Sequence, residues 1–336
     1  MSGRILFLGG NGMIGSAAAR EAVAQGAELT IITRSAPRRP VPDGVRLLTG
    51  DVRDPAALAG LLGDERWDAV VNWVAFTPAD LDGHVEYFGD RTGQYVFIST
   101  CSVFGRPIPL LPITESSPRR QPVFGYARDK IACELLLEQA HRESGFPLTI
   151  VRPFHTYDET TVPLLSGWTA VERMRAGEPV VVHGDGTSLW TLMHSADFAR
   201  AFVPLLGEGH AIGESVNVVS GDVLTWDQIH LELARAAGVR EPLLVHRSSE
   251  SIAEEIPGWR EVLEHDFRHT MLFDTTKLQR LVPGFAPRVS FAEGARRVVR
   301  HHDAHDGARG VDAELGAAFD RLSARVAAEP DRSQVV

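Results

Sequence analysis

The first stretch of the chain constrains the fold most, because it reads RILFLGGNGMIG over residues 4–15. It begins as a short apolar run, the pattern of a buried parallel strand, and passes directly into a turn that contains Gly9, Gly12 and Gly15. A helical pattern follows over residues 16–25. Glycine lets the backbone of such a turn approach a pyrophosphate, which the amides at the helix N-terminus then attract. The stretch predicts a dinucleotide-binding unit, and the alternative is an ordinary tight turn between a strand and a helix.

Composition limits the class of protein. A chain of 336 residues with 44% apolar content can bury a substantial core, as one two-lobed unit or as two domains. Its two cysteines, Cys101 and Cys133, argue against a disulfide framework and predict a reducing, cytoplasmic location. The formal charge of −10 disfavours nucleic acid or an anionic membrane surface as a partner. The start of the sequence has no apolar segment of signal or membrane length, so we expect no membrane association.

The second predicted strand, Leu29–Thr33, ends at a position that distinguishes two cofactors. An acidic residue there would bond the ribose hydroxyls of NAD, whereas an arginine can accept the 2′-phosphate of NADP. The sequence continues with Arg34, and Arg38 and Arg39 follow with no acidic residue between them. We therefore predict NADP(H). The alternative is NAD(H) held by backbone contacts, with Arg34 as a solvated loop charge.

A tyrosine and a lysine lie four residues apart in the segment GYARDK at residues 125–130. On a helix, Tyr126 and Lys130 would share one face. A free tyrosine has a pKa near 10 and is a poor base at neutral pH, but an adjacent ammonium stabilises its phenolate. The pair can therefore exchange a proton with a substrate oxygen. The alternative is an ordinary helix surface, on which this spacing is common.

Together and in this order, these motifs resemble the short-chain dehydrogenase/reductase superfamily, in its extended or atypical NAD-dependent epimerase/dehydratase branch, over roughly residues 4–303. The resemblance implies hydride transfer with Tyr126 as general acid/base, Lys130 on the nicotinamide ribose and Thr100 bonded to the substrate oxygen. The implied cofactor-binding residues are Gly9, Gly12, Met13, Ile14, Gly15, Arg34, Asp51, Val52, Val74, Ala75 and Lys130. The implied substrate-binding residues are Phe76, Thr77, Cys101, Ser102, His155 and Trp190.

Three departures from the family's pattern bear on the reaction. Cys101 and Ser102 stand where dehydratases of this branch carry Asp-Glu, which argues against sugar-nucleotide dehydration. Trp190 stands where sugar-nucleotide enzymes carry an arginine that grips the diphosphate, so we expect a less charged substrate, unless Trp190 is only a core aromatic. His155 replaces an asparagine and either contacts substrate or packs locally.

The segment over residues 77–94 is shorter than in full-length relatives and contains no asparagine. The family's usual proton relay, which needs that asparagine, and its usual helical dimer interface are therefore not predicted for this chain. A homodimer is expected only as one of the possible oligomeric states. We expect His84 in this segment at the surface. The His/Asp cluster over residues 301–306 is expected to be a solvated helix end, so no metal site is predicted.

The predicted fold is α/β, a Rossmann-type doubly wound parallel sheet with a smaller mixed α/β C-terminal substrate lobe. We expect a dinucleotide-binding domain over residues 1–165, a substrate-binding lobe over 166–303 with some strands returning to the sheet, and a C-terminal helical extension over 304–336. In the lobe, Thr225 and Gln228 predict a capped helix, and residues 275–281 are among the segments expected to complete the lobe. In the extension, residues 311–328 form an amphipathic pattern that must pack on the body or on a partner, and residues 329–336 are expected to be mobile.

The sequence therefore supports one main hypothesis and two rivals. The main hypothesis is NADPH-dependent reduction of a ketone on a small-molecule or sugar-like metabolite. The first rival is an NAD-dependent epimerase of sugars or sugar nucleotides, which oxidises and re-reduces one carbon with a retained cofactor. The second rival is a non-catalytic cofactor-binding or RNA-binding relative, against which the intact Thr100, Tyr126 and Lys130 and the acidic charge argue.

Overall fold

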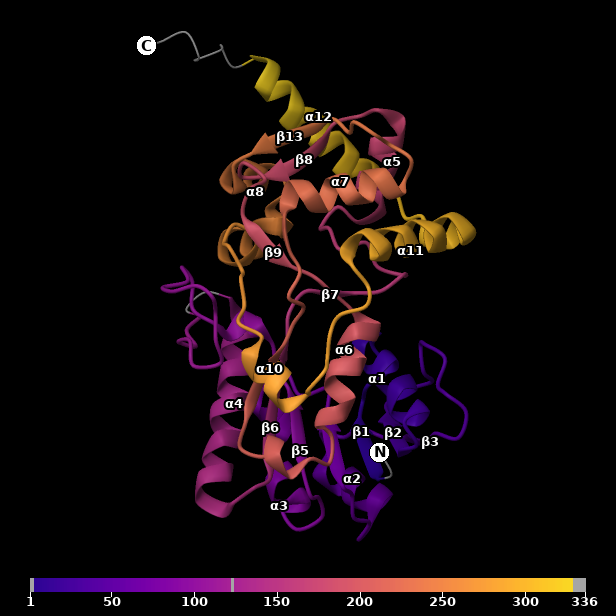
Figure 1. Ribbon diagram of the computed structural model, residues 1–336, viewed down its shortest axis with the longest axis vertical. Helices are drawn as coiled ribbons and strands as arrows, with labels where there is room; N and C mark the ends of the chain where they lie inside the picture. The colour runs from indigo at the N-terminus through magenta and orange to yellow at the C-terminus, as the bar shows by residue number, and fades with distance from the viewer. Residues whose placement is uncertain (1–2, 122–123, 329–336) are drawn as a thin grey trace. The chain divides into compact units, whose positions relative to one another are not determined.

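The computed structural model describes residues 3–121 and 124–328, so the mobility expected for residues 329–336 lies outside the described part of the chain (Figure 1). The chain divides into two compact units. Unit 1 contains the residues up to Thr156, together with Leu192–Gly221 and Phe273–Arg288. Unit 2 contains Tyr157–Thr191, Asp222–Leu272 and the residues from Val289 onward. The chain therefore passes between the units several times.

Unit 1 is built on one sheet of seven parallel strands. In sheet order they are β11 (Ser215–Val218), β6 (Leu148–Pro153), β5 (Tyr95–Ile98), β4 (Ala69–Asn72), β1 (Arg4–Leu8), β2 (Glu28–Thr33) and β3 (Arg46–Thr49). Strand β1 pairs with β2 on one side and with β4 on the other, so the strand order reverses between β1 and β4. Ligands of such sheets bind beside this reversal, at the carboxyl ends of the strands. The topology confirms the predicted Rossmann-type fold.

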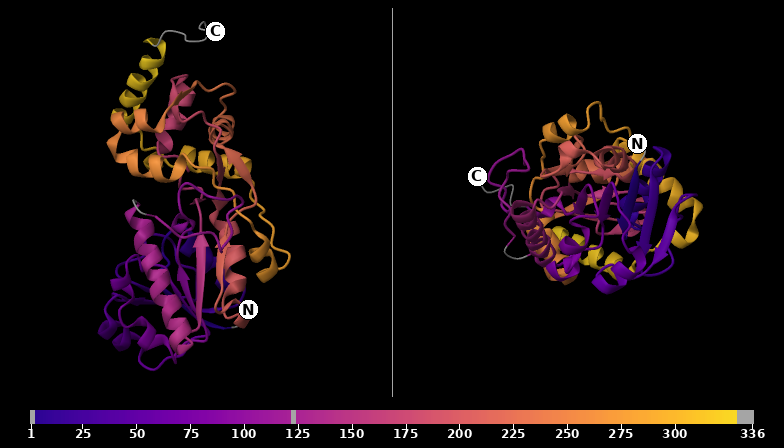
Figure 2. Two further views of the ribbon diagram at one scale, coloured as in Figure 1. Left: turned by 90° about the vertical axis from the view of Figure 1, so that its left-hand side faces the viewer. Right: turned by 90° about the horizontal axis from the view of Figure 1, so that it is seen from below.

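Helices cover both faces of this sheet, which explains why its strands are apolar at successive positions instead of alternate ones. One face carries α1 (Met13–Ala24), α6 (Ser195–Phe202) and α10 (Thr276–Leu281), and the other carries α2 (Pro55–Leu62), α3 (His84–Phe88) and α4 (Gly125–Ser144). Within β1, Phe7 belongs to the core on the first face, whereas Leu6 and Leu8 belong to the core on the second. Figure 2 shows the long helix α4, in magenta, beside the strands.

Helix α10 departs from the predicted organisation. The sequence places residues 275–281 in the smaller lobe, but α10 belongs to unit 1, contacts β11 and contributes Leu278 to the first core. An amphipathic helix of two turns can cover any apolar surface, so its pattern does not say which surface it covers.

Unit 2 is a mixed α/β unit with two small sheets. Strand β8 (Val180–His183) pairs in parallel with β13 (Leu244–Arg247), and β9 (Leu189–Thr191) pairs antiparallel with β12 (Val223–Thr225). Its helices are α5 (Gly167–Ala176), α7 (Trp226–Ala236), α8 (Ser249–Glu255), α9 (Arg260–Val262), α11 (Phe291–Ala304) and α12 (Ala313–Ala328). Thr225 and Gln228 form the predicted capping box of α7. The short strands β7 (Thr156–Tyr157) and β10 (Met193–His194) stand where the chain passes between the units.

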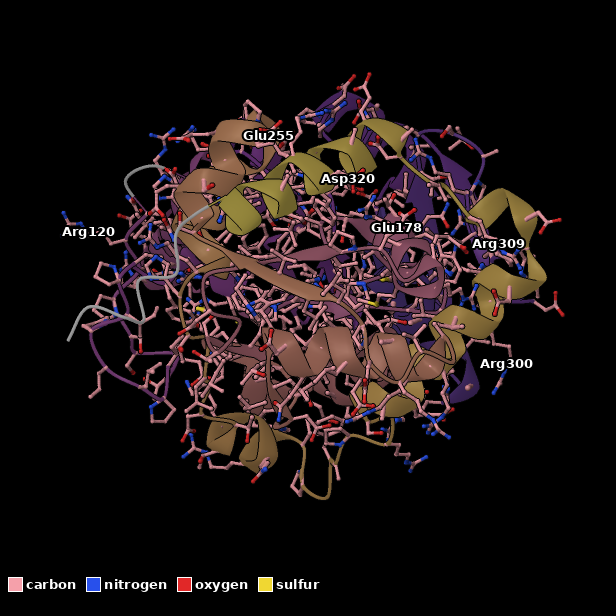
Figure 3. The ribbon with its side chains drawn as sticks, turned by 90° about the horizontal axis from the view of Figure 1, so that it is seen from above. Arg120, Glu178, Glu255, Arg300, Arg309 and Asp320 are labelled. Atoms are coloured by element: carbon pink, nitrogen blue, oxygen red, sulfur yellow. The ribbon has the colours of Figure 1, made fainter. Side chains whose placement is uncertain are left out.

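The C-terminal helix α12 packs on unit 2, one of the two places expected for it. The Phe319 side chain is buried, and the Arg321 guanidinium lies 2.6 Å from the Glu255 carboxylate of α8. Asp320 pairs with Arg173 of α5. Figure 3 shows Glu255 and Asp320 on this surface. The helix is therefore part of unit 2.

Candidate functional site

A cavity of about 920 Å³ lies in unit 1 beyond the carboxyl ends of the central strands, where the fold predicts a ligand. Its lining includes most of the residues that the sequence singled out. These are Gly9, Gly12, Ile14, Gly15, Arg34, Asp51, Val52, Val74, Phe76, Thr77, Thr100, Tyr126 and Lys130. The cavity therefore gathers side chains from segments more than a hundred residues apart, although the role of each remains a prediction.

The three glycines of the first turn serve different purposes. Gly9 has φ +82°, and a Cβ there would lie 2.2 Å from the Val74 side chain. A Cβ on Gly15 would lie 2.4 Å from the backbone oxygen of Gly10. A Cβ on Gly12 would meet no heavy atom of the described residues within 4 Å, although Gly12 lines the cavity. Gly9 and Gly15 are therefore required by the turn itself, whereas Gly12 leaves a space that a ligand can fill.

The N-terminus of α1 faces this space without a protein side chain to cap it. Gly12 is the N-cap residue, and it makes no side-chain capping hydrogen bond to the first amides of the helix. Free amides at a helix N-terminus are a ready site for a phosphate group. The turn thus fits the diphosphate of a dinucleotide, with the amides of Met13 and Ile14 as donors.

The loop after β2 brings positive charge to the lining of the cavity. Arg34 and Arg38 are exposed, and both line the cavity together with Ser35. The backbone amide of Arg39 donates to the Asn11 side chain at 3.3 Å, which ties this loop to the glycine turn. The arrangement suits an additional phosphate on the adenosine side of a dinucleotide.

Asp51, which also lines the cavity, is held by a neighbour. The Arg53 guanidinium donates to both of its carboxylate oxygens, at 2.9 and 2.6 Å. These hydrogen bonds are the main reason that the pKa of Asp51 falls to about 2, so the carboxylate is charged at every physiological pH. This pair was not predicted, although the spacing Asp-Val-Arg is visible in the sequence.

Lys130 lies on α4 at the inner end of the cavity, and its side chain is 2% exposed. Its ammonium donates to the carbonyl oxygens of Ala75 at 2.7 Å and Ile98 at 2.8 Å. The rings of Phe76 and Phe97 lie 4.7 and 4.8 Å from the same nitrogen. Burial lowers the pKa of Lys130 to about 8, because desolvation disfavours the charged form. The group is thus positioned firmly and titrates close to neutral pH.

Tyr126 lies one helical turn before Lys130 and borders the same cavity. Burial raises the pKa of its phenol, and a hydrogen bond with the Thr100 hydroxyl opposes that shift. Thr100 itself lies just beyond β5 and accepts the backbone amide of Ser102 at 3.1 Å, which fixes its side chain. The three residues predicted to be catalytic therefore line the same cavity, where Tyr126, whose residue is 40% exposed, presents a phenol that is protonated at neutral pH.

Six predicted site residues, all within the described part of the chain, do not line the cavity. They are Met13, Ala75, Cys101, Ser102, His155 and Trp190. Met13 and Ala75 are backbone neighbours of lining residues. The Cys101 thiol is fully buried and donates to the Arg152 carbonyl at 3.2 Å, and Trp190 packs against Trp226 in unit 2. Burial lowers the pKa of His155 to about 4, so it is neutral at physiological pH.

The structure also contains a polar group beneath the cavity that the sequence analysis did not identify. Asn72, His84 and Tyr95 are fully buried and bonded to one another. The expectation that His84 lies at the surface is wrong, because the short α3 turns it into the core. The available signal was a polar Asn72 at the end of an otherwise apolar strand.

Neither a metal site nor a membrane span is found among residues 3–121 and 124–328. No cluster of three or more His, Cys, Asp or Glu side chains there could hold a metal ion. In the His/Asp cluster, His302 stacks on Trp168 and Asp303 pairs with Arg175. No helix in the same residues is long and apolar enough to cross a membrane.

Comparison with known proteins places this site in a family. The sequence model of the NAD dependent epimerase/dehydratase family matches residues 5–90 and 84–219. The chain is 28% identical over 331 residues to 2′-dehydrokanamycin reductase of Streptomyces kanamyceticus, covering 97% of this chain and 91% of the relative. It is 24% identical over 307 residues to the chloroplast stem-loop binding protein of 41 kDa b of Arabidopsis thaliana, covering 87% and 77% of the two chains.

Solved structures agree on the fold. The epimerase Mth375 from Methanothermobacter thermautotrophicus superposes with a TM-score of 0.71 at 19% identity, covering 90% of this chain and 93% of that one. The family match extends across the glycine turn, the Thr100 loop and the helix of Tyr126 and Lys130. The chain belongs to the NAD dependent epimerase/dehydratase family and is an NAD(P)-dependent enzyme of the short-chain dehydrogenase/reductase type.

Proposed function

We propose that this enzyme reduces a ketone on a small sugar-like molecule with NADPH, and that Tyr126 supplies the proton. The observation that carries the proposal is that Thr100, Tyr126 and Lys130 line the same cavity as the glycine turn. The cofactor, when bound, supplies the hydride to the carbonyl carbon. The protein's residues then have to hold the ketone and deliver one proton to its oxygen.

The protonation states of the site suit reduction. Burial raises the pKa of Tyr126, so the phenol is protonated at neutral pH and can donate to a developing alkoxide. The phenolate that remains lies one helical turn from the Lys130 ammonium, which stabilises it. Thr100 can hold the substrate oxygen beside the phenol. Proton donation by Tyr126 and stabilisation by Lys130 and Thr100 would together complete the conversion of ketone to alcohol.

The preference for NADPH is supported by the loop after β2. Arg34 and Arg38 line the cavity where the adenosine ribose would lie, and residues 33–39 contain no carboxylate to bond both ribose hydroxyls. A 2′-phosphate there would gain charge-assisted hydrogen bonds. NAD, without that phosphate, would leave both guanidinium groups in water.

The substrate class is inferred from what the site lacks and from a relative. Cys101 and Ser102 replace the acidic pair of dehydratases, and Trp190 replaces the arginine that grips a sugar nucleotide. A relative that matches along 97% of the chain is named for the reduction of 2′-dehydrokanamycin. We therefore propose a ketone on an uncharged or cationic sugar ring, bound against Phe76 and Thr77, with unit 2 as the substrate-binding lobe.

The alternative function is an NAD-dependent epimerase, which the family name also supports. An epimerase keeps its cofactor bound and consumes none. A non-catalytic or RNA-binding role is the second alternative, since one relative is named a stem-loop binding protein, but the charge of −10 and the intact Thr100, Tyr126 and Lys130 oppose it. The enzyme is also proposed to form a homodimer, for which no particular surface is assigned.

The test begins with the purified protein. It is denatured, any released nucleotide is identified, and the nucleotide-free protein is titrated with NADPH and NADH. Exchangeable binding that prefers NADPH, followed by NADPH oxidation with a panel of ketosugars and keto-aminoglycosides, supports the reductase. Stoichiometric NAD carried through purification, with isomerisation and no net cofactor consumption, replaces it by the epimerase. Binding of neither nucleotide removes both.

A further inference from the structure

A buried chain of hydrogen bonds begins beneath the adenosine side of the cavity. The His84 Nε2 atom lies 2.7 Å from the carbonyl oxygen of Val52, a residue that lines the cavity. The His84 Nδ1 atom lies 2.8 Å from the Tyr95 hydroxyl. That hydroxyl in turn accepts the Asn72 side-chain amide at 2.8 Å. The three side chains are each 0% exposed.

The chain continues from Asn72 to the catalytic end of the cavity. The Asn72 side-chain oxygen accepts the backbone amides of Val74 at 3.0 Å and Ala75 at 2.9 Å. The Ala75 carbonyl then accepts the Lys130 ammonium at 2.7 Å. Every backbone group that these side chains bond belongs to Val52, Val74 or Ala75, in segments that form the wall of the cavity.

The direction of each bond in this chain is determined. A carbonyl oxygen can only accept, so the His84 Nε2 atom carries the proton toward Val52. Burial lowers the pKa of His84, so the ring is neutral and its Nδ1 atom accepts from the Tyr95 hydroxyl. The Tyr95 oxygen is then free to accept from Asn72, whose own oxygen holds the turn. The Asn72 side-chain amide also lies 3.4 Å from the His84 Nδ1 atom, as a second and longer contact to the nitrogen that accepts from Tyr95.

We propose that His84, Tyr95 and Asn72 are positioning residues that set the turn after β4 and, through the Ala75 carbonyl, the place of the Lys130 ammonium. The inference rests on the proposed part of Lys130 in cofactor binding and catalysis. Three apolar side chains would fill the same volume without the cost of burying polar groups, so packing alone does not explain the set. Apolar side chains could not form hydrogen bonds with the backbone amides of Val74 and Ala75 or with the carbonyl of Val52.

The first test deletes one hydroxyl. In Tyr95→Phe the chain is cut in the middle, the turn after β4 loses its support, and the Ala75 carbonyl no longer stabilises the ammonium as well. The dissociation constant for NADPH should rise about tenfold, the factor that one ordinary hydrogen bond corresponds to. Binding should also begin to weaken at a lower pH than in the wild type. Tyr87→Phe is the matched control, because the Tyr87 hydroxyl donates to the Gly63 carbonyl outside this chain.

The outcomes separate the inference from the proposed function. Wild-type protein that binds neither NADPH nor NADH overturns the proposed function. Wild-type protein that binds, with a Tyr95→Phe variant whose melting temperature falls while its NADPH affinity and pH dependence match those of Tyr87→Phe, overturns the positioning role alone.

A second measurement covers the case in which Tyr95→Phe does not fold. The imidazole nitrogens of His84 are observed by NMR in the wild-type protein. We expect the neutral tautomer with the proton on Nε2 from pH 6 to 9, and a change in the Nδ1 signal when NADPH is added. A His84 signal of the other tautomer, or one that NADPH does not move, contradicts the proposal.

Discussion

The ammonium nitrogen of Lys130 lies 2.7 Å from the carbonyl oxygen of Ala75, which belongs to the turn after β4. The lysine of the predicted catalytic trio is therefore bonded directly to the turn after β4. This bond orients the ammonium, but the same position buries it and lowers its pKa. Loss of the proton should therefore raise the free energy of unfolding and weaken cofactor binding.

Stability and cofactor binding should change with pH in opposite senses because of Lys130. Its pKa is about 8 in the folded protein against 10.5 in an unfolded chain. Between these values the unfolded state binds the proton and the folded state does not, so the free energy of unfolding rises with pH. The rise from Lys130 should approach about 3 kcal/mol. NADPH binding should weaken above pH ~8, where the ammonium is lost.

Urea denaturation and NADPH titration between pH 7 and 10 measure the two effects. The control is Lys130→Met, which removes the titrating group and keeps most of the apolar stem. The unfolding free energy of the wild type minus that of the variant should grow with pH, and at pH 10 it should approach about 3 kcal/mol more than at pH 7. An equal difference at pH 7 and pH 10 would mean that burial does not lower the pKa of Lys130.

Removing the phenolic hydroxyl of Tyr126 should abolish most turnover while leaving the cofactor bound. In Tyr126→Phe, the proton donor is lost and the ring remains, so kcat should fall at least about a hundredfold. The dissociation constant for NADPH should change little, because Lys130 and the glycine turn are intact. Steady-state kinetics with the best ketone found in screening make the measurement, and Tyr87→Phe should retain full activity. Full activity of Tyr126→Phe would remove the proposed mechanism.

The choice between NADPH and NADH should depend on Arg34 and Arg38. The variant with both changed to alanine should bind NADPH about tenfold or more weakly, since two charge-assisted hydrogen bonds to the 2′-phosphate are lost. Its affinity for NADH should be unchanged. Raising the salt concentration should weaken NADPH binding in the wild type more than in the variant. Arg120→Ala, an exposed change outside the cavity lining, is the control. Equal losses for both nucleotides would contradict the assignment.

Local patterns in the sequence predicted much of unit 1. A strand, a glycine turn and a helix were expected at the start of the chain, and β1 and α1 are observed there. The start of α2 also follows a local pattern, because Asp54 caps it and proline occupies its first position. Short motifs also pointed to Thr100, Tyr126 and Lys130 as candidate catalytic residues, and the structure places all three in the lining of one cavity.

Features that depend on contacts between distant segments were not predicted. His84 looks like a surface residue because a lone histidine between polar neighbours has no periodic pattern, and only the fold brings it to Tyr95 and Val52. Helix α10 was expected in the other lobe for the same reason. The sequence shows which face of a helix is apolar, but the topology of the fold determines which part of the protein that face packs against.

The space at Gly12 provides the sharpest test of whether the glycine turn binds a cofactor or is an ordinary tight turn. Alanine at position 12 meets no described heavy atom within 4 Å, and the residue has φ −82°, which any side chain accepts. Gly12→Ala should therefore keep the stability of the wild type. Its methyl group would occupy the place of the diphosphate, so NADPH affinity should fall at least about tenfold.

Two further variants give this result its meaning. Gly60→Ala, also in open space but in α2 away from the cavity, should leave stability and binding intact. Gly15→Ala should lower the melting temperature, because its Cβ would lie 2.4 Å from a backbone oxygen that cannot yield cheaply. Unchanged NADPH affinity in a stable Gly12→Ala would favour the ordinary turn, since a turn needed only for folding tolerates a methyl group that points into empty space. Lost affinity with unchanged stability separates the two explanations, because only a ligand can be displaced from a space that the protein does not fill.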